Sequence, residues 1–190
     1  PGAGRLAVIL PWEFGSVPRT WVEAMDDAVD EAWVPSAYVR GMLIADGADP
    51  ARVHVVPNGV DLDVYRPDGP RRDGLPEGRR LLFVGGTIQR KGIDLLLEAY
   101  RSAIGPDDGL VLVIKDVGST TFYRGRNARA EIDALAATPG APIVVLDDDL
   151  DDEALASLYR SCDVLVHPYR GEGFAMPVLE AMASGLPVIA

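Results

Sequence analysis

The sequence predicts an α/β protein built on a doubly wound, parallel sheet. In its second half, short apolar runs typical of buried strands alternate with segments whose apolar residues recur at helical spacing. Such alternation implies right-handed crossover connections between parallel strands. The first half shows the same alternation over a shorter length. We therefore expect two α/β units.

The first 60 residues are predicted to hold three strands, two helices and a turn. The strands are expected at 6–10, 32–34 and 53–56, and one helix follows Pro18. The other helix is expected after Ser36, a residue type that caps helices, and it ends near Gly47. Residues 57–59, Pro-Asn-Gly, have the composition of a turn.

A stretch without periodicity separates the two halves. It is rich in proline, glycine, arginine and aspartate, which is typical of a linker. The expected organisation is therefore an N-terminal part (1–66), a linker (67–80) and a C-terminal domain (81–190).

The C-terminal domain is predicted to contain four strands, each followed by a helix. Strands are expected at 81–84, 110–114, 143–146 and 164–167, and helical stripes at 93–100, 131–137, 155–159 and from Pro177 onward. Gly185 and Pro187 then mark the end of the last helix. Ligands bind such sheets beyond the carboxyl ends of the strands, so the loops there are the candidates for chemistry.

Composition narrows the class of protein. With 48% hydrophobic and 25% charged residues in 190, the chain has the make-up of a globular protein. Its net charge of -11 argues against nonspecific nucleic-acid binding. The single Cys162 excludes an internal disulfide and is expected to be a buried thiol. Because the chain begins with Pro1 and ends in a strand-like run, we expect it to be cut at both ends.

The most informative stretch is Gly171–Glu180, a glycine-containing loop that leads into the last helix. Pro177 suits the first helical position, and the backbone amides just before it, around Phe174 to Met176, favour an anion. Two carboxylates, Glu172 and Glu180, can accept hydrogen bonds from hydroxyls. Together they predict a ligand that carries both phosphates and sugar hydroxyls.

The run from Glu172 to Val188, EGFAMPVLEAMASGLPV, resembles the signature of family 4 retaining glycosyltransferases of the GT-B fold. Residues 33–36, 53–61 and 65–67 resemble the closing segment of that family's N-terminal domain. The resemblance implies a GT-B protein represented by the end of its acceptor-side domain and most of its donor-binding domain.

The loop at residues 85–92, GGTIQRKG, fits this resemblance with one departure. Glycines allow close backbone approach and Lys91 can meet a phosphate as a point charge, but neither a dinucleotide fingerprint nor a P-loop is present. Lys91 takes the position of the family's phosphate lysine, after Gly85. Gly86 stands where the family usually has arginine. We hypothesise that Arg124, or alternatively Arg126, supplies the missing cation.

Two further loops follow the next strands. Residues 115–119 favour turn chemistry, with Gly118 in an unusual conformation. The acidic run 147–153 lacks the ligand spacing of a calcium loop, and Asp151 is predicted to cap a helix instead. The resemblance places the nucleotide base near this run, which makes Leu150 a candidate contact.

The resemblance implies transfer of a sugar from a nucleotide-sugar donor to a hydroxyl of a glycan, lipid or small-molecule acceptor, with retention of configuration. Lys91 and Glu172 are the implied catalytic residues. The implied donor-binding residues are Gly85, Gly86, Lys91, Gly173, Phe174, Ala175, Met176, Glu180, Arg124 and Leu150. No metal or cofactor and no nucleic-acid partner is expected. The implied location is cytoplasmic, and peripheral membrane contact through an upstream domain stays open.

Two alternatives of other classes remain. One is a nucleotide-sugar-binding domain without transferase activity, which the glycine at position 86 favours. The other is a GT-B sugar-nucleotide epimerase, which the glutamate-containing run disfavours. Because the acceptor-side domain is incomplete in this chain, we expect the fragment by itself to be inactive.

Overall fold

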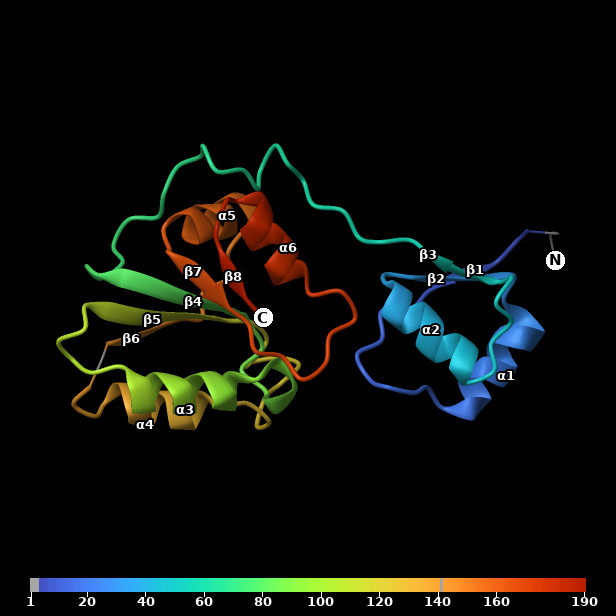
Figure 1. The fold of residues 1–190 in the computed structure, drawn as a ribbon, viewed down its shortest axis with the longest axis horizontal. Coiled ribbons are helices and arrows are strands. Elements are labelled where there is room, and N and C mark those ends of the chain that lie inside the picture. The colour runs from blue at the N-terminus through green and yellow to red at the C-terminus, as the bar shows by residue number, and fades with distance from the viewer. Residues whose placement is uncertain (1–3, 141) are drawn as a thin grey trace. The chain divides into compact units, whose positions relative to one another are not determined.

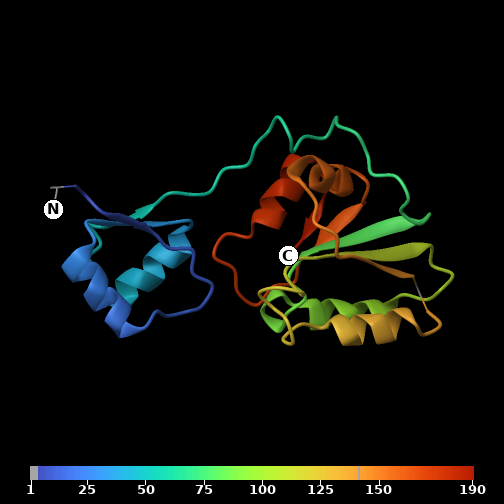
Figure 2. The same cartoon turned by 180° about the vertical axis from the view of Figure 1, so that it is seen from behind.

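The computed structural model describes residues 4–140 and 142–190. The chain forms two compact units: the first comprises residues up to 59 together with 171–175, and the second comprises 60–170 and 176–190. Each unit is a parallel sheet with helices packed on it, as Figure 1 and, from behind, Figure 2 show.

The first unit has a three-stranded sheet in the order β1-β2-β3. Its elements are β1 (Ala7–Ile9), α1 (Arg19–Ala28), β2 (Glu31–Val34), α2 (Ala37–Ala45) and β3 (Val53–Val55). The Ser36 hydroxyl accepts a hydrogen bond from the amide of Val39 and so caps α2, as predicted. Val34, Val39 and Leu43 are completely buried in the core of this unit. The predicted three strands and two helices are confirmed.

The second unit has a five-stranded parallel sheet in the order β6-β5-β4-β7-β8. The strands are β4 (Arg79–Gly85), β5 (Leu110–Asp116), β6 (Ile143–Leu146), β7 (Val164–Val166) and β8 (Val188–Ile189). The helices are the short η1 (Gln89–Lys91), α3 (Ile93–Ala103), α4 (Arg129–Ala136), α5 (Asp152–Arg160) and α6 (Met176–Ala183). The doubly wound sheet predicted from the sequence is confirmed.

Helices cover both faces of this sheet, with α3 and α4 on one face and α5 and α6 on the other (Figure 1). Because successive side chains of a strand point to opposite faces of the sheet, β5 contributes side chains to two hydrophobic cores. Val111 and Val113 join the core beneath α5 and α6, whereas Leu112 and Ile114 join the core beneath α3 and α4. Cys162 is buried as predicted, and its burial raises the pKa of the thiol to about 12.

The predicted linker, residues 67–80, packs onto the second unit, and its end forms the start of β4. The buried Tyr65 ring belongs to the core beneath α5 and α6. The buried guanidinium of Arg160 donates hydrogen bonds to the carbonyl oxygens of Val64, Arg66 and Pro70, at 3.1, 3.2 and 2.7 Å. These contacts span about ninety residues of sequence, which is why composition alone does not reveal them. The division between the units falls at residues 59–60.

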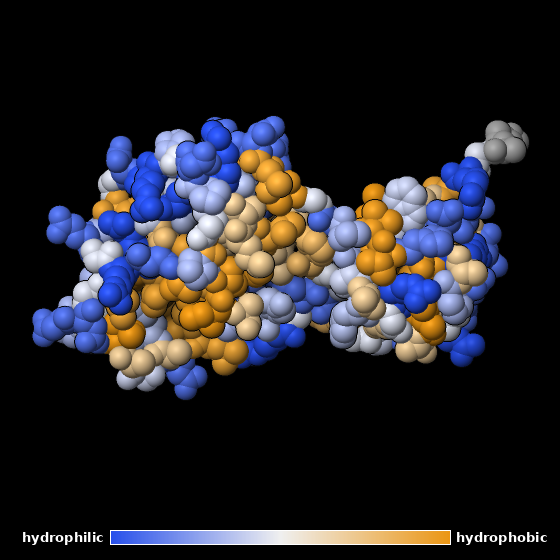
Figure 3. All heavy atoms as spheres, turned by 45° about the horizontal axis from the view of Figure 1, so that its top comes forward, coloured by the Kyte–Doolittle hydropathy of each residue, from blue (hydrophilic) through white to orange (hydrophobic). Residues whose placement is uncertain are grey.

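Charged and apolar residues are interspersed over the face of the second unit shown in Figure 3. None of the helices in the described part of the chain combines the length and the apolar character that crossing a membrane requires.

Candidate functional site

The strand order brings the loops after β4 and β7 to one place. From β4 the chain continues outward through β5 and β6, and then returns to pair β7 on the other side of β4. The winding of the sheet therefore reverses between β4 and β7. Ligands of open α/β sheets bind at such a reversal, beyond the carboxyl ends of the strands.

The two loops are locked together. Gly92 has a φ of +74°, and a Cβ atom there would overlap the carbonyl oxygen of Pro168, in the loop after β7. The amide of Arg170 donates to the carbonyl of Arg90 at 2.8 Å, and its guanidinium donates to both carboxylate oxygens of Asp94 at 2.7 and 2.8 Å. This hydrogen bonding holds the pKa of Asp94 below its usual value. The loop after β7 thus positions η1 and the start of α3.

Lys91 lies at this reversal of the sheet. A Cβ atom at Gly85 would stand 3.9 Å from Cδ of Lys91 and 3.8 Å from Cε1 of His167. The His167 imidazole is completely buried and packs against the rings of Phe83 and Tyr169, with centroid distances of 5.7 and 5.4 Å. The glycine at position 85 therefore lets the lysine chain and the imidazole approach the end of β4 closely.

Gly86, where the family usually has arginine, faces an aromatic ring. A Cβ atom at Gly86 would lie 2.5 and 2.7 Å from two ring carbons of Tyr123, and one at Gly118 would lie 3.2 Å from the same ring. The side-chain amide of Asn127 closes this segment by donating to the carbonyls of Ser119 and Tyr123, at 3.1 and 2.9 Å. The ring of Tyr123 thus takes the space into which a side chain at position 86 would grow.

The two arginines considered as substitutes for this missing arginine lie on the same segment. Arg124 is exposed, and its Nε donates to the carbonyl of Thr120 at 3.0 Å. Arg126 is also exposed. The residue in contact with Gly86 is Tyr123, which the sequence did not single out; a tyrosine thirty-seven residues from a glycine carries no local signal. The hypothesis about Arg124 stays a prediction.

We expect Gly86→Arg to lower the free energy of unfolding of the second unit by about 1–3 kcal/mol, the usual cost of overpacking. The Tyr123 ring stands in the path of the new side chain. Tyr123→Ala in the same chain should remove most of that loss. Thermal unfolding of the two single variants and the double variant measures the coupling. A Gly86→Arg variant as stable as the parent would mean that the Tyr123 ring moves aside without a cost in stability.

Glu180 lies on α6 and is half-buried. One oxygen of its carboxylate, Oε2, accepts a hydrogen bond from the hydroxyl of Tyr159, on α5, at 2.8 Å. Burial raises the pKa of Glu180, and the Tyr159 hydrogen bond opposes this. Since Tyr159 itself is completely buried, it holds the carboxylate in a fixed orientation. A fixed carboxylate is a suitable acceptor for ligand hydroxyls.

Helix α6 begins one residue earlier than predicted, at Met176, so that Pro177 is its second residue. The residue before it, Ala175, is buried and has a φ of +63°, a left-handed conformation that costs a non-glycine residue about 1–2 kcal/mol. Backbone strain of this kind clusters at ligand-binding sites.

The structure divides the informative loop–helix between the units. Residues 171–175, which include Glu172, Gly173 and Phe174, belong to the first unit, where a Cβ atom at Gly173 would lie 3.2 Å from the amide nitrogen of Trp12. Met176 and Glu180 belong to the second unit. The second unit thus carries Gly85, Gly86, Lys91 and Glu180 as well as Arg124 and Leu150.

We expect Glu180→Gln to raise the thermal stability at neutral pH, because it removes a carboxylate that is costly to ionise when half-buried. The pKa of Glu180 is raised in the folded state. The stability it contributes is therefore complete below its ordinary pKa of 4.5 and is lost as pH rises through the raised value. The melting-temperature difference between variant and parent should grow from pH 4 toward pH 8. A difference independent of pH would contradict this assignment.

A pocket of about 280 Å³ lies at the carboxyl ends of β4, β5 and β6. Leu150 lines it, together with Val84, Arg129, Asp147, Asp149, Leu155 and residues 115–121. Its contact with the nucleotide base stays a prediction. In the acidic run, Asp151 caps α5 by accepting from the amide of Ala154 at 2.8 Å, which confirms the predicted cap. Gly118 has a φ of +83°, as expected for its turn. Over the described residues, no three potential ligand side chains are grouped as a metal site would require.

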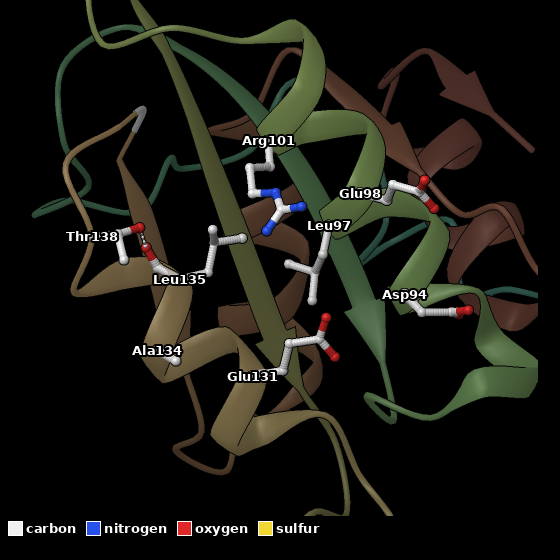
Figure 4. Close-up of a pocket in the computed structure, with 8 residues that line it drawn as sticks. All are labelled: Asp94, Leu97, Glu98, Arg101, Glu131, Ala134, Leu135 and Thr138. Atoms are coloured by element: carbon white, nitrogen blue, oxygen red, sulfur yellow. Dashed lines mark hydrogen bonds between the residues drawn. The ribbon is translucent and has the colours of Figure 1, made fainter.

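A larger groove of about 510 Å³ lies between α3 and α4 (Figure 4). Its side chains come from the outer sides of these helices and include Asp94, Glu98, Arg101 and Glu131. The groove runs along α3 and α4 and is lined by neither the glycine loop nor Lys91. We therefore assign the ligand site to the smaller pocket and the adjoining loops, where the sheet topology predicts it.

The sequence is similar to that of known glycosyltransferases. Residues 78–190 match the family model described as glycosyl transferases group 1. The chain is 40% identical over 185 residues to the D-inositol 3-phosphate glycosyltransferase of Geodermatophilus obscurus, covering 91% of this chain and 41% of that protein. The chain thus spans less than half the length of this relative.

Two solved structures share the fold. The sucrose-phosphate synthase of Thermosynechococcus elongatus is similar with a TM-score of 0.73 and 26% identity, over 90% of this chain and 43% of that one. The Anabaena Alr3699/HepE structure in complex with UDP and glucose has a TM-score of 0.71 at 17% identity, over 98% of this chain and 52% of that one. With its two parallel α/β units, the chain has the GT-B type of fold and belongs to the glycosyl transferases group 1 family.

Proposed function

We propose that this chain contains the donor site of a glycosyltransferase that moves a sugar from a nucleotide-diphosphate sugar to an acceptor hydroxyl, with retention of configuration. The observation that carries the proposal is the position of Lys91, on a glycine loop at the point where the sheet reverses its winding. The solved relative that holds UDP and glucose and the relatives named D-inositol 3-phosphate glycosyltransferase support it.

In this proposal Lys91 neutralises the diphosphate, which becomes the leaving group, and the backbone amides at the start of α6 assist it. Groups placed where negative charge develops stabilise the transition state without reorganising. Glu180, oriented by Tyr159, accepts hydrogen bonds from ribose hydroxyls. Glu172 contacts the donor sugar. We propose that these groups suffice without a metal ion and that the acceptor is a hydroxyl compound such as an inositol phosphate, a glycan or a lipid.

The glycine at position 86 supports a second candidate, a domain that binds the nucleotide sugar without transferring the sugar. The ring of Tyr123 covers the place of one expected cation, and a phenol ring supplies no positive charge. Transfer by the longer protein, extended to the length of its relatives, distinguishes the two. Glycoside formation supports the transferase, whereas binding without product supports the second candidate.

The donor site is tested by calorimetric titration of the chain with UDP, GDP and ADP. We expect one diphosphate to bind and Glu180→Gln to weaken it by about ten-fold, because a charged acceptor is replaced by a neutral one. Glu131→Gln, which alters an exposed carboxylate on α4, is the matched control and should bind like the parent. Failure of all three nucleotides to bind would reject the proposal. For the longer protein, the anomeric configuration of the product by NMR tests retention.

A further inference from the structure

Lys115 is a buried cation that no part of the proposed mechanism uses. It is one of only two lysines in the chain, the other being Lys91. It lies near the end of β5, is 5% exposed, and lines the 280 Å³ pocket. An ammonium group in such a position is costly unless its donors find acceptors.

The acceptors that the protein supplies do not satisfy it. Of the three N–H donors of Lys115, one is accounted for by a hydrogen bond of 2.8 Å to the carbonyl oxygen of Asp116. Within the described residues, no carboxylate forms an ion pair with it. Among the nearby acids, Asp147 pairs with Arg129 at 2.8 Å. Oδ1 of Asp116 accepts from the hydroxyl of Thr87 at 3.4 Å, whereas its Oδ2 is buried without a hydrogen-bond partner among the described residues. Lys115 therefore has donors left for a ligand.

The pocket suits a flat ring. Val84, Leu150 and Leu155 give it apolar walls, and the charged side chains of Arg129, Asp147 and Asp149 also line it. Its volume of about 280 Å³ is just below the range of typical ligand pockets, about 300 to 1,000 Å³. It lies at the ends of β5 and β6, whereas Lys91 lies at the reversal between β4 and β7. A nucleotide whose diphosphate meets Lys91 would reach this pocket with its base.

We infer that Lys115 selects the base, by donating a hydrogen bond to the carbonyl oxygen of uracil (O4) or guanine (O6). This inference rests on the proposed donor site. Cytosine and adenine carry an amino group at the corresponding position, which is itself a donor. An ammonium facing an amino group gains no hydrogen bond and leaves two donors buried together, so the pocket discriminates against CDP and ADP.

The test compares UDP with CDP and GDP with ADP. In each pair, one base has a carbonyl oxygen and the other an amino group at the position to which Lys115 is proposed to donate its hydrogen bond. Titrations of the parent chain should show the tighter of UDP and GDP binding at least about ten-fold better than its amino counterpart. Lys115→Met, which keeps the length and the apolar stem, should reduce that ratio to about three-fold or less. Pyrophosphate, which has no base, should bind Lys115→Met and the parent equally.

Lys91→Met is the matched comparison, since it removes the only other lysine. It should weaken all the diphosphates and pyrophosphate together and preserve the preference between bases. Equal losses for every ligand in Lys115→Met, pyrophosphate included, would place Lys115 on the diphosphate and overturn the inference. A parent that binds CDP or ADP as well as UDP or GDP would overturn it without any variant. If no nucleotide binds the folded parent, the donor site itself fails, and the inference falls with it.

Discussion

Lys91→Met is expected to weaken binding of the preferred nucleoside diphosphate by about 30- to 150-fold, or about 2–3 kcal/mol. Hydrogen bonds to ionised groups are the strong ones, and here the proposed acceptor is a diphosphate in a site walled by the loops after β4 and β7. The dissociation constant from calorimetry measures the loss. The loss should shrink as salt rises, because screening weakens the parent's charge contact.

Arg101→Met is the matched control. It also removes one positive charge from the second unit, but Arg101 is exposed on α3 and lines the groove of Figure 4. It should leave the dissociation constant within about two-fold of the parent, the effect of a screened surface charge. Equal losses in both variants would mean that net charge, and not the position of Lys91, governs binding.

Gly92→Ala is expected to destabilise the second unit by about 2–5 kcal/mol and to abolish donor binding under conditions where the parent is saturated. A left-handed alanine costs about 1–2 kcal/mol, and the added methyl group meets the carbonyl oxygen of Pro168, which costs a further 1–3 kcal/mol or so in forced backbone movement. The obstacle is main chain, so no side-chain rotation relieves it. Lys91 is the residue next to this glycine, and the same displacement moves it.

Gly109→Ala isolates the first contribution, the cost of the left-handed conformation. Gly109 has a φ of +65°, but a Cβ atom there meets nothing within 4 Å. It should therefore show only the cost of the left-handed conformation. The three tryptophans, Trp12, Trp21 and Trp33, all lie in the first unit, so their fluorescence follows that unit alone, while far-ultraviolet circular dichroism follows both. Equal unfolding free energies for the two variants would show that the contact with Pro168 carries no strain.

Local sequence determined the elements of the fold. Apolar runs set the buried strands, and helical spacing with caps such as Ser36 and Asp151 set the helices. These signals act between residues a few positions apart, so they can be read from the chain directly. The same holds for the glycine loop before Lys91 and for the loop–helix that contains Glu172 and Glu180, where the motif is contiguous.

Tertiary structure decided what depends on contacts between distant residues. Four features of this kind join residues that no periodicity relates. Arg160 binds the predicted linker, the Tyr123 ring packs against Gly86, Tyr159 donates a hydrogen bond to Glu180, and Lys115 is buried in the pocket that residues from several loops line. The order of the strands decided which loops meet. The charge and orientation of a side chain depend on its burial and on its hydrogen bonds to neighbours that the fold brings together. The sequence therefore indicated most of the candidate site residues but not the groups that position them.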